Sequence, residues 1–355
     1  MRIFWVVGEQ SGDLQAASVA QAINAYDPAI KQWGWGGRHL EGAGVKLLAN
    51  IANTQFMGFV EVLRKAGRIF KMLRAVKADI QAFQPDTIVL VDYPGFNMRI
   101  AKWAKSQGFR VVYFIPPKVW AWKSGRAKKI DAYCDEVLSI LPFEQNWYHS
   151  RGLNLTYVGN PLREKYAFQN GFMPDSNRIA LLPGSRGQEI ERLLPIMLSV
   201  AKRMPNWEFR IIQTESTVYQ VNTHQLPENV RVIKGDLGEC LVGMQAALVC
   251  SGTATLEVAL LGVPQIIMYM ANPISLTIAK MFVKLPYFSL PNLILERKVL
   301  PELLQDEIRS HMIVRELDSL CANPMDQIAA YTEIKERLEM KQPAVNAAQI
   351  IIGNA

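Results

Sequence analysis

The chain contains a series of short, almost unbroken apolar runs that alternate with longer segments of helical pattern. One run reads Ile-Val-Leu-Val at residues 88–91, and another reads Ala-Ala-Leu-Val-Cys at 246–250. Strands that are apolar on both faces are typical of parallel sheets with both faces covered. Their alternation with helices predicts a doubly wound α/β fold.

This alternation occurs in two sets, separated by a polar stretch at 167–177 that contains proline and glycine. The expected strands are 3–7, 31–37, 87–96, 110–117 and 136–143 in the first set, and 178–182, 208–213, 230–234, 246–252 and 264–270 in the second. We therefore expect two Rossmann-like domains, at 1–166 and 176–323. A polar helical tail at 324–355 is expected to pack back on the first domain or to join a partner subunit.

Length and composition support two domains and an anionic partner. The chain has 355 residues, of which 50% are hydrophobic, so both domains can bury a core. The net charge of +7 favours a phosphorylated substrate, an acidic lipid surface or nucleic acid, and does not choose among them. The four cysteines are widely spaced, which indicates neither a zinc site nor a disulfide framework and fits a reducing cytosol.

The N-terminal segment predicts neither a signal peptide nor a membrane anchor. It becomes polar soon after its first apolar run, at Gly8 and Glu9. No stretch reaches the roughly 18 uninterrupted apolar residues of a membrane span. We therefore expect a cytoplasmic protein that is soluble or peripherally bound to a membrane.

Turns with glycine follow several of the expected strands, where open α/β sheets bind their ligands. In the second domain two such turns open helices, and helix N-termini offer free N–H groups to anions. The residues concerned are Gly184, Ser185 and Arg186 in the first turn and Ser251, Gly252 and Thr253 in the second. This pattern predicts a diphosphate site, although an ordinary strand–turn–helix junction with a surface arginine is the alternative.

Three carboxylates lie at positions suited to chemistry. Asp92 ends an apolar strand, where it could act as a general base or cap the following turn. Glu9 follows the first strand, where it could contact a sugar hydroxyl or only line the turn. Glu257 lies one helical turn beyond Thr253, where it could hold a ribose diol or be an ordinary glutamate on a helix face.

Basic and aromatic residues gather in two segments. At 56–79 the pattern is amphipathic, with Phe59 and Phe70 on the apolar face and Arg64, Lys65 and Arg68 opposite. A helix that packs on the core and exposes a basic face is the simpler interpretation, and a segment at an anionic membrane is the alternative.

The second segment places Trp120 and Trp122 beside several lysines and arginines. This composition suits lipid headgroups or RNA. Because no RNA-binding module is recognisable, we prefer the membrane and expect no nucleic-acid partner.

Several familiar motifs are missing from the sequence. It has no G-x-G-x-x-G after the first strand, no phosphate-binding P-loop and no G-x-S-x-G. The four histidines are scattered, and there is no Asp-x-Asp pair. We therefore expect neither a bound cofactor nor a metal.

Eight segments together resemble one family. They are GEQSGD (8–13), FMGFVEVL (56–63), VDYPGFN (91–97), VWAW (119–122), ILPFE (140–144), LLPGSR (181–186), SGTATLE (251–257) and SLPNLI (289–294). These segments run across nearly the whole chain, and the chain resembles the lipid-A-disaccharide synthases of glycosyltransferase family 19. The resemblance implies the GT-B fold, in which two Rossmann-like domains face a central cleft.

The resemblance also implies an inverting, metal-independent transfer. The donor would be UDP-2,3-diacylglucosamine, the acceptor 2,3-diacylglucosamine 1-phosphate (lipid X), and the products UDP and the β-1,6-linked lipid A disaccharide 1-phosphate. Members are peripheral proteins on the cytoplasmic face of the inner membrane of Gram-negative bacteria, and a homodimer is an open possibility for this chain.

By the same resemblance, Asp92 becomes the base, with Glu9 supporting it or the acceptor and Ser11 on the acceptor side. Arg186 and the backbone of Gly184 and Ser185 meet the diphosphate, together with the second turn at 251–253. Glu257 takes the ribose, and Asn292 approaches the donor.

Two positions depart from the family pattern. Asn160 stands where the family usually has histidine, and Pro116 where it usually has serine. Asn160 cannot act as an acid or a base, which leaves the rate and substrate details open. The alternatives are another GT-B enzyme acting on a UDP-sugar, or a non-catalytic protein that binds UDP-sugars or phospholipids.

Overall fold

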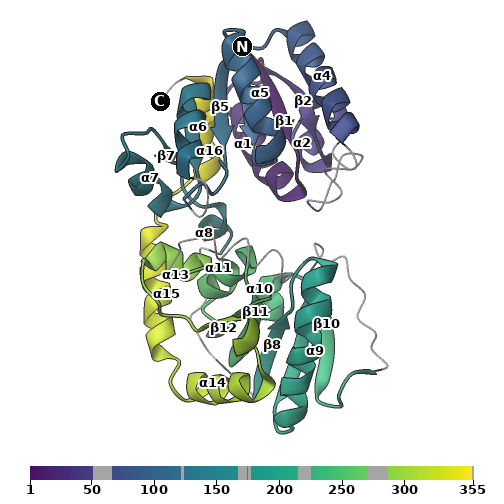
Figure 1. Cartoon of the computed structure of the whole chain (residues 1–355), viewed down its shortest axis with the longest axis vertical. Helices are drawn as coiled ribbons and strands as arrows, with labels where there is room; N and C mark the ends of the chain where they lie inside the picture. The colour runs from purple at the N-terminus through teal and green to yellow at the C-terminus, as the bar shows by residue number, and fades with distance from the viewer. Residues whose placement is uncertain are drawn as a thin grey trace. The chain divides into compact units, whose positions relative to one another are not determined.

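The computed structural model describes residues 1–50, 66–120, 124–166, 174, 177–214, 225–270 and 287–353. The chain divides into two compact units. Unit 1 comprises Met1–Pro161 and Met340–Ala355, and unit 2 comprises Leu162–Glu339. Each unit is a parallel sheet covered by helices on both faces (Figure 1).

Unit 1 contains a seven-stranded sheet with the order β3-β2-β1-β4-β5-β6-β7, in which every pairing is parallel. The strands are β1 (Arg2–Val7), β2 (Lys31–Gly36), β3 (Lys46–Asn50), β4 (Thr87–Val91), β5 (Arg110–Phe114), β6 (Glu136–Ser139) and β7 (Thr156–Tyr157). The helices are α1 (Gln10–Tyr26), α2 (Arg38–Gly42), α4 (Ala66–Phe83), α5 (Pro94–Ser106), α6 (Ala127–Tyr133), α7 (Pro142–His149) and α16 (Pro343–Ile352).

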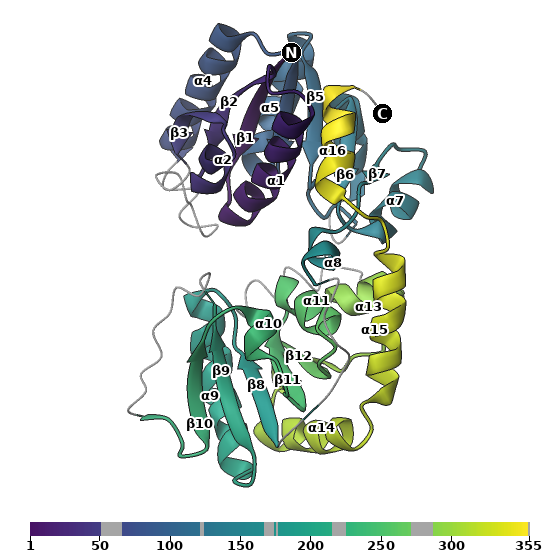
Figure 2. The same cartoon turned by 180° about the vertical axis from the view of Figure 1, so that it is seen from behind.

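The core of unit 1 has two layers because successive strand residues point to opposite faces of the sheet. Phe4 packs with residues of α4, α5 and α6 on one face. Ile3 and Trp5 pack with residues of α1 and α16 on the other face. Figure 2 shows α16 beside α1, although the two helices are far apart in the sequence.

Unit 2 contains a six-stranded parallel sheet with the order β10-β9-β8-β11-β12-β13. The strands are β8 (Arg178–Leu182), β9 (Glu208–Gln213), β10 (Val230–Lys234), β11 (Ala246–Cys250), β12 (Gln265–Tyr269) and β13 (Glu302–Leu304). The helices are α8 (Pro161–Lys165), which begins at the last residue of unit 1, α9 (Gly187–Arg203), α10 (Leu237–Cys240), α11 (Thr253–Leu260), α13 (Leu290–Leu295), α14 (Ser310–Ala322) and α15 (Met325–Arg337).

The ten expected strands are all present, and the two-domain α/β prediction is confirmed. Three additional strands, β3, β7 and β13, were not predicted from the sequence. They lie at sheet edges and have two to five residues, and β3 alternates half-buried with exposed residues instead of being apolar throughout.

The boundaries differ from those expected at 166, 176 and 323, and the tail at 324–355 is shared between the units. Its first helix, α15, joins unit 2, where the hydroxyl of Tyr331 donates to the carbonyl of Val263 at 3.1 Å. The second helix, α16, packs on unit 1, where Arg110 donates to the carbonyls of Ile350 and Ile351 at 2.8 and 2.5 Å. Tail packing on the first unit was one of the two expectations, and α16 follows it.

Helix α4 lies in the segment expected to be amphipathic. Its fully described buried residues include Leu73, Val76 and Ile80. Phe70 lies off this stripe and is 67% exposed, so its assignment to the core-facing side is wrong. Phe59, Arg64, Lys65, Trp122 and the side chain of Arg68 lie outside the described residues. Within the described ranges, no helix is both long and apolar enough to cross a bilayer.

Candidate active site

The sheet of unit 1 reverses its strand order between β1 and β4, and we call this place the first switch point. Open α/β sheets bind ligands beyond the carboxyl ends of the strands at such a reversal. Val7 at the end of β1 pairs with Val91 at the end of β4, so Gly8 and Asp92 leave neighbouring strands at the same level. The sequence predicted that both strand ends belong to the site, and the sheet topology brings them together.

Asp92 and Tyr93 form an unusual turn at the end of β4. Their φ angles are +46° and +48°, in the left-handed region that costs a residue with a side chain about 1–3 kcal/mol. The carbonyl of Asp92 accepts hydrogen bonds from the Asn97 amide at 2.8 Å and from the Tyr113 hydroxyl at 2.9 Å. Asn97 also donates to the carbonyls of Val6 and Val91, which ties β1 to β4. These bonds hold the strained turn in place.

The carboxyl group of Asp92 is a stronger base than an ordinary aspartate. Burial raises its pKa above 3.8, because the charged form is desolvated. A hydrogen bond from the backbone of Tyr93 and the charge of Lys118 oppose this rise. A carboxylate with a raised pKa takes a proton from a hydroxyl more readily.

Glu9 lies close enough to Tyr93 for its charge to act on the Tyr93 hydroxyl. Glu9 is the exposed N-cap residue of α1, and burial together with the charge of Glu9 raises the pKa of Tyr93. Gly8 is required here, because a Cβ at this position would lie 2.3 Å from the Tyr93 ring. Glu9 is therefore placed beside the turn that carries Asp92.

Two further residues of the GEQSGD segment have different surroundings. Ser11 is exposed in the first turn of α1. Asp13 is buried, and its carboxylate accepts the backbone N–H groups of Gly37 at 2.6 Å and His39 at 3.0 Å. Asp13 thus joins α1 to the turn after β2.

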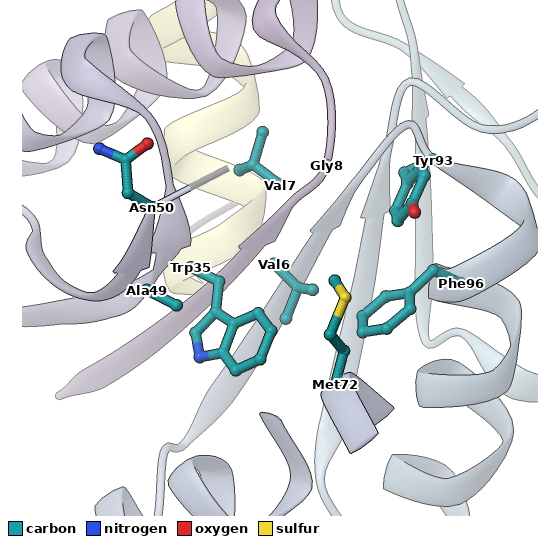
Figure 3. A pocket seen from close by; sticks show the side chains of 9 residues that line it. All are labelled: Val6, Val7, Gly8, Trp35, Ala49, Asn50, Met72, Tyr93 and Phe96. Carbon is teal, nitrogen blue, oxygen red and sulfur yellow. The ribbon is translucent and has the colours of Figure 1, made fainter. Parts of the chain in front are cut away.

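A small apolar hollow lies beside the first switch point (Figure 3). The side chains of Trp35, Met72 and Phe96 converge on it, and Gly8 and Tyr93 form part of its wall. The hollow therefore borders the two residues that flank Glu9 and Asp92 in the sequence.

The sheet of unit 2 reverses its order between β8 and β11, and this is the second switch point. Leu182 at the end of β8 pairs with Val249 in β11, so both glycine turns leave the sheet at the reversal. The turn at 183–186 enters α9, and the turn at 251–252 enters α11. The two anion-binding loops predicted from the sequence are therefore neighbours in one unit.

Glu189 organises the loop before α9. One of its carboxylate oxygens accepts the backbone N–H groups of Ser185 at 3.1 Å and Arg186 at 3.3 Å, and the other accepts from the Arg186 guanidinium at 3.0 Å. Gly184 fits beside it with φ +121°, and a Cβ there would lie 2.6 Å from the Glu189 carboxylate. This capping box shapes the loop and holds Arg186.

The backbone N–H of Ser185, which was expected to contact the diphosphate, donates to the Glu189 carboxylate instead. Within the described ranges, the N–H groups of Gly187 and Gln188 at the start of α9 make no hydrogen bond, and both residues are exposed. The groups free for an anion are therefore these two N–H groups and the remaining donors of Arg186, whose side chain is 63% exposed.

The second loop is more open. Gly252 and Thr253 are exposed, and among the described residues no atom beyond the chain neighbours lies within 4 Å of the place where a Cβ of Gly252 would be. Ser251 is half-buried, and its backbone N–H donates to the carbonyl of Met268. The loop thus leaves the N-terminus of α11 accessible.

Glu257 on α11 has a buried partner. The hydroxyl of Tyr166, which is 2% exposed, donates to Oε1 of Glu257 at 3.0 Å. Burial and the nearby charge of Glu257 raise the pKa of Tyr166 far above its usual range. Tyr166 therefore remains a donor and Glu257 the acceptor.

Asn292 is fully buried, and its amide is saturated within unit 2. Its Nδ2 donates to the Leu300 carbonyl and the Glu302 carboxylate, and its Oδ1 accepts from the N–H groups of Val299 and Leu300. No group of this side chain is free for a donor sugar. Its structural role is to hold the loop before β13, and its approach to the donor stays a prediction.

The first unit contains three other residues singled out from the sequence. Trp120 is half-buried, and its indole N–H donates to the buried carboxylate of Glu144 at 2.5 Å, which gives this tryptophan a structural partner. Asn160 is buried, and its amide donates to the carbonyl of Ile140 at 2.8 Å. Pro116 is buried. In the described part of the chain, no group of three or more potential metal ligands comes together.

Several residues that shape the two switch points were not predicted from the sequence. Glu189 could have been found, because a glutamate three residues after an N-cap is the mark of a capping box. Asn97 ends the VDYPGFN segment, but the sequence gives it no role. Tyr113 and Tyr166 act through contacts with residues far along the chain, and no local sequence pattern indicates them.

Solved structures share the whole fold. The glycosyltransferase of kitacinnamycin matches with a TM-score of 0.69 at 13% identity, over 99% of this chain and 98% of that chain. The spinosyn rhamnosyltransferase in complex with thymidine diphosphate matches with a TM-score of 0.67 at 13% identity, over 99% and 100%. The UDP-GlcNAc 2-epimerase of Neisseria meningitidis matches with a TM-score of 0.55 at 13% identity, over 100% and 99%. The fold is thus of the GT-B class, with two Rossmann-like domains.

Sequence relatives narrow the class to one family. A model of the lipid-A-disaccharide synthetase family matches residues 3–353. The lipid-A-disaccharide synthase of Syntrophus aciditrophicus (strain SB) is 35% identical, over 97% of this chain and 95% of its own length. That of Myxococcus xanthus (strain DK1622) is 34% identical, over 99% and 97%. The chain belongs to the lipid-A-disaccharide synthetase family.

Proposed function

We propose that the protein is a lipid-A-disaccharide synthase that transfers the sugar of UDP-2,3-diacylglucosamine to lipid X. The single observation that carries this proposal is the family match over residues 3–353. The two switch points add chemistry that suits the reaction, with a raised-pKa carboxylate in unit 1 and accessible helix N-termini in unit 2.

Asp92 is the general base in this proposal. Its carboxylate takes the proton of the acceptor 6-hydroxyl as that oxygen attacks the anomeric carbon of the donor. The new C–O bond forms as the bond to UDP breaks, UDP leaves with the electron pair, and the anomeric configuration is inverted. Glu9 and Ser11 lie on the acceptor side.

The loops of unit 2 hold UDP. Arg186 and the N–H groups of Gly187 and Gln188 meet the diphosphate from α9, and Ser251, Gly252 and Thr253 present the N-terminus of α11 to it. Glu257 accepts from the ribose hydroxyls. These preorganised donors stabilise the charge that develops on departing UDP, so we propose that the reaction needs no metal.

We also propose that the protein acts at the anionic cytoplasmic surface of the inner membrane. Exposed Phe70 lies next to exposed Lys71 and near exposed Arg74 on α4, a combination that favours an anionic lipid surface. Arg64, Lys65 and Trp122 stay predictions for the same surface, as does the homodimer.

A metal-free assay tests the function. The protein is incubated with EDTA, UDP-2,3-diacylglucosamine and lipid X in mixed micelles, and UDP and the disaccharide 1-phosphate are both quantified. Equal amounts of the two products support the synthase. UDP release without disaccharide would indicate a different UDP-sugar enzyme, and UDP binding without either product would indicate a binding protein.

A further inference from the structure

The contact between Tyr166 and Glu257 joins two parts of unit 2 that are 91 residues apart. Tyr166 follows α8, immediately after the chain enters unit 2, and Glu257 lies on the helix that begins at the second switch point. No sequence motif includes Tyr166, and the reaction described above does not use it. Its hydroxyl nevertheless meets the one carboxylate assigned to the ribose.

Tyr166 is fixed from several sides. It is 2% exposed, and its backbone N–H donates to the carbonyl of Leu162 at 3.0 Å. The ammonium group of Lys165 lies 4.8 Å from the centre of the Tyr166 ring and 3.5 Å from a carboxylate oxygen of Asp236. A side chain held in this way can orient a flexible partner.

Glu257 is half-buried and has a long, rotatable side chain that loses entropy when a ligand fixes it. The hydrogen bond from Tyr166 engages Oε1 only. A carboxylate offers about four acceptor positions, so Oε2 and the remaining position on Oε1 stay available for sugar hydroxyls. The bond thus restricts Glu257 before the ligand arrives without using up its capacity to accept.

We propose that Tyr166 is a positioning residue that holds Glu257 for the ribose diol and so makes the site selective for ribonucleotides. This inference rests on the proposed function, in which Glu257 binds the ribose of UDP. Because Tyr166 acts through the diol contact, its loss reduces the preference for a 2′-hydroxyl and leaves the diphosphate contacts intact.

The test compares UDP with 2′-deoxy-UDP by calorimetry on the full-length protein and three variants. Tyr166→Phe removes the hydroxyl and keeps the ring. Glu257→Ala removes the acceptor. Tyr331→Phe is the matched control, because it removes another buried hydroxyl of unit 2 that bonds to Val263 and Gln327 instead of Glu257.

The native protein is expected to bind UDP about tenfold more tightly than 2′-deoxy-UDP, the size of effect expected for one hydrogen bond to a charged group. In Tyr166→Phe, UDP binding is expected to weaken about fivefold, the size of effect typical of one intramolecular hydrogen bond, while 2′-deoxy-UDP, which keeps only one hydroxyl of the diol, is expected to weaken less. Tyr331→Phe is expected to keep the native affinities for both ligands.

The other outcomes distinguish a failure of the Tyr166 inference from a failure of the proposed ribose contact. If Tyr166→Phe keeps the native preference, or weakens both ligands equally, Tyr166 is structural only and the inference is overturned. If Glu257→Ala keeps the native preference, the ribose contact of the proposed function is wrong, and this is seen in a protein that still has Tyr166.

Discussion

The two switch points lie at the same place in two similar sheets, but different means stabilise them. In unit 1 the chain leaves β4 through two strained residues, Asp92 and Tyr93, and side-chain donors bind the backbone carbonyl of Asp92. In unit 2 the chain leaves β8 through Gly184, and a carboxylate binds the backbone N–H groups that follow. The first arrangement leaves a carboxylate for chemistry, and the second leaves N–H groups and a guanidinium for an anion.

This difference shows how one architecture supplies two functions. The parallel strands deliver both turns to a sheet reversal, where ligands bind. A few side chains then decide what each turn can do. Where they bind the carbonyls of the turn, a carboxylate is left to act as a base, and where they bind its N–H groups, the following N–H groups and a guanidinium are left to bind an anion. We expect substitutions at the first switch point to change turnover, and substitutions at the second to change nucleotide affinity.

The largest effect is expected for Asp92→Asn. The amide fills the same space but cannot take a proton, so kcat should fall by a factor of about 10² to 10⁴, the range typical of a lost general base. Initial rates of disaccharide formation measure this. Asp86→Asn is the control, because Asp86 lies at the opposite end of β4 and accepts from the backbone of Arg2. Turnover of Asp92→Asn at the native rate would remove Asp92 from the chemistry.

Arg186→Ala should act on the nucleotide instead. Loss of one charged hydrogen-bond donor to the diphosphate is expected to raise the Kd for UDP by a factor of about 10 to 100. Isothermal calorimetry checks this, with Arg203→Ala at the other end of α9 as the control. If both variants bind UDP equally well, α9 does not hold the diphosphate.

Gly184→Ala tests how the second loop is built. The new Cβ would meet the Glu189 carboxylate at a φ of +121°, so the free energy of unfolding should fall by about 1–3 kcal/mol and UDP binding should weaken. Gly187→Ala, three residues later, meets no atom of the described residues within 4 Å and should leave the free energy of unfolding near its native value. Urea denaturation of the two variants gives the comparison, and equal losses in both would show that the capping box does not depend on Gly184.

The smallest effect is expected from removing the positive charge of Lys118, which acts on the carboxyl group of Asp92. Asp92 must be ionised to act, so kcat/KM should fall as the pH decreases through its pKa, which burial places above 3.8. Lys118 lowers this pKa, and Lys118→Met should therefore move the acidic limb of the pH profile to higher pH. The control is Lys128→Met, on α6. A limb that moves to lower pH, or does not move, would show that Asp92 does not set it.

The sequence predicted what depends on local pattern. The apolar runs identified ten strands, and turns at strand ends identified the loops that the sheet topology places at both switch points. Short edge strands such as β3 bury too little apolar surface to give a pattern. The position of Phe70 was also wrong, because a helical stripe about 100° wide leaves the residues at its margin undecided until the packing partner is known.

The sequence predicted which strand ends form the site. It did not predict the hydrogen bonds that hold the turns after those strands. Asn97 and Tyr166 act on carbonyls or carboxylates brought close only by the folded sheet. At Asn292 the motif matches the family, and the folded structure adds that its amide is saturated inside unit 2, so its approach to the donor stays a prediction. Sequence motifs therefore locate the loops of the site, whereas the hydrogen bonds of the folded structure determine which side chains can still contact a ligand.

The central claim is that the first switch point supplies the base and the second binds the nucleotide. It is best tested by titrating UDP into the Asp92→Asn protein in a calorimeter. If unit 1 supplies the base and unit 2 binds the nucleotide, the Kd should stay within about twofold of the native value, although turnover is lost. A weakening of about tenfold or more, equal to about 1.4 kcal/mol, would mean that Asp92 takes part in nucleotide binding and that the division is wrong.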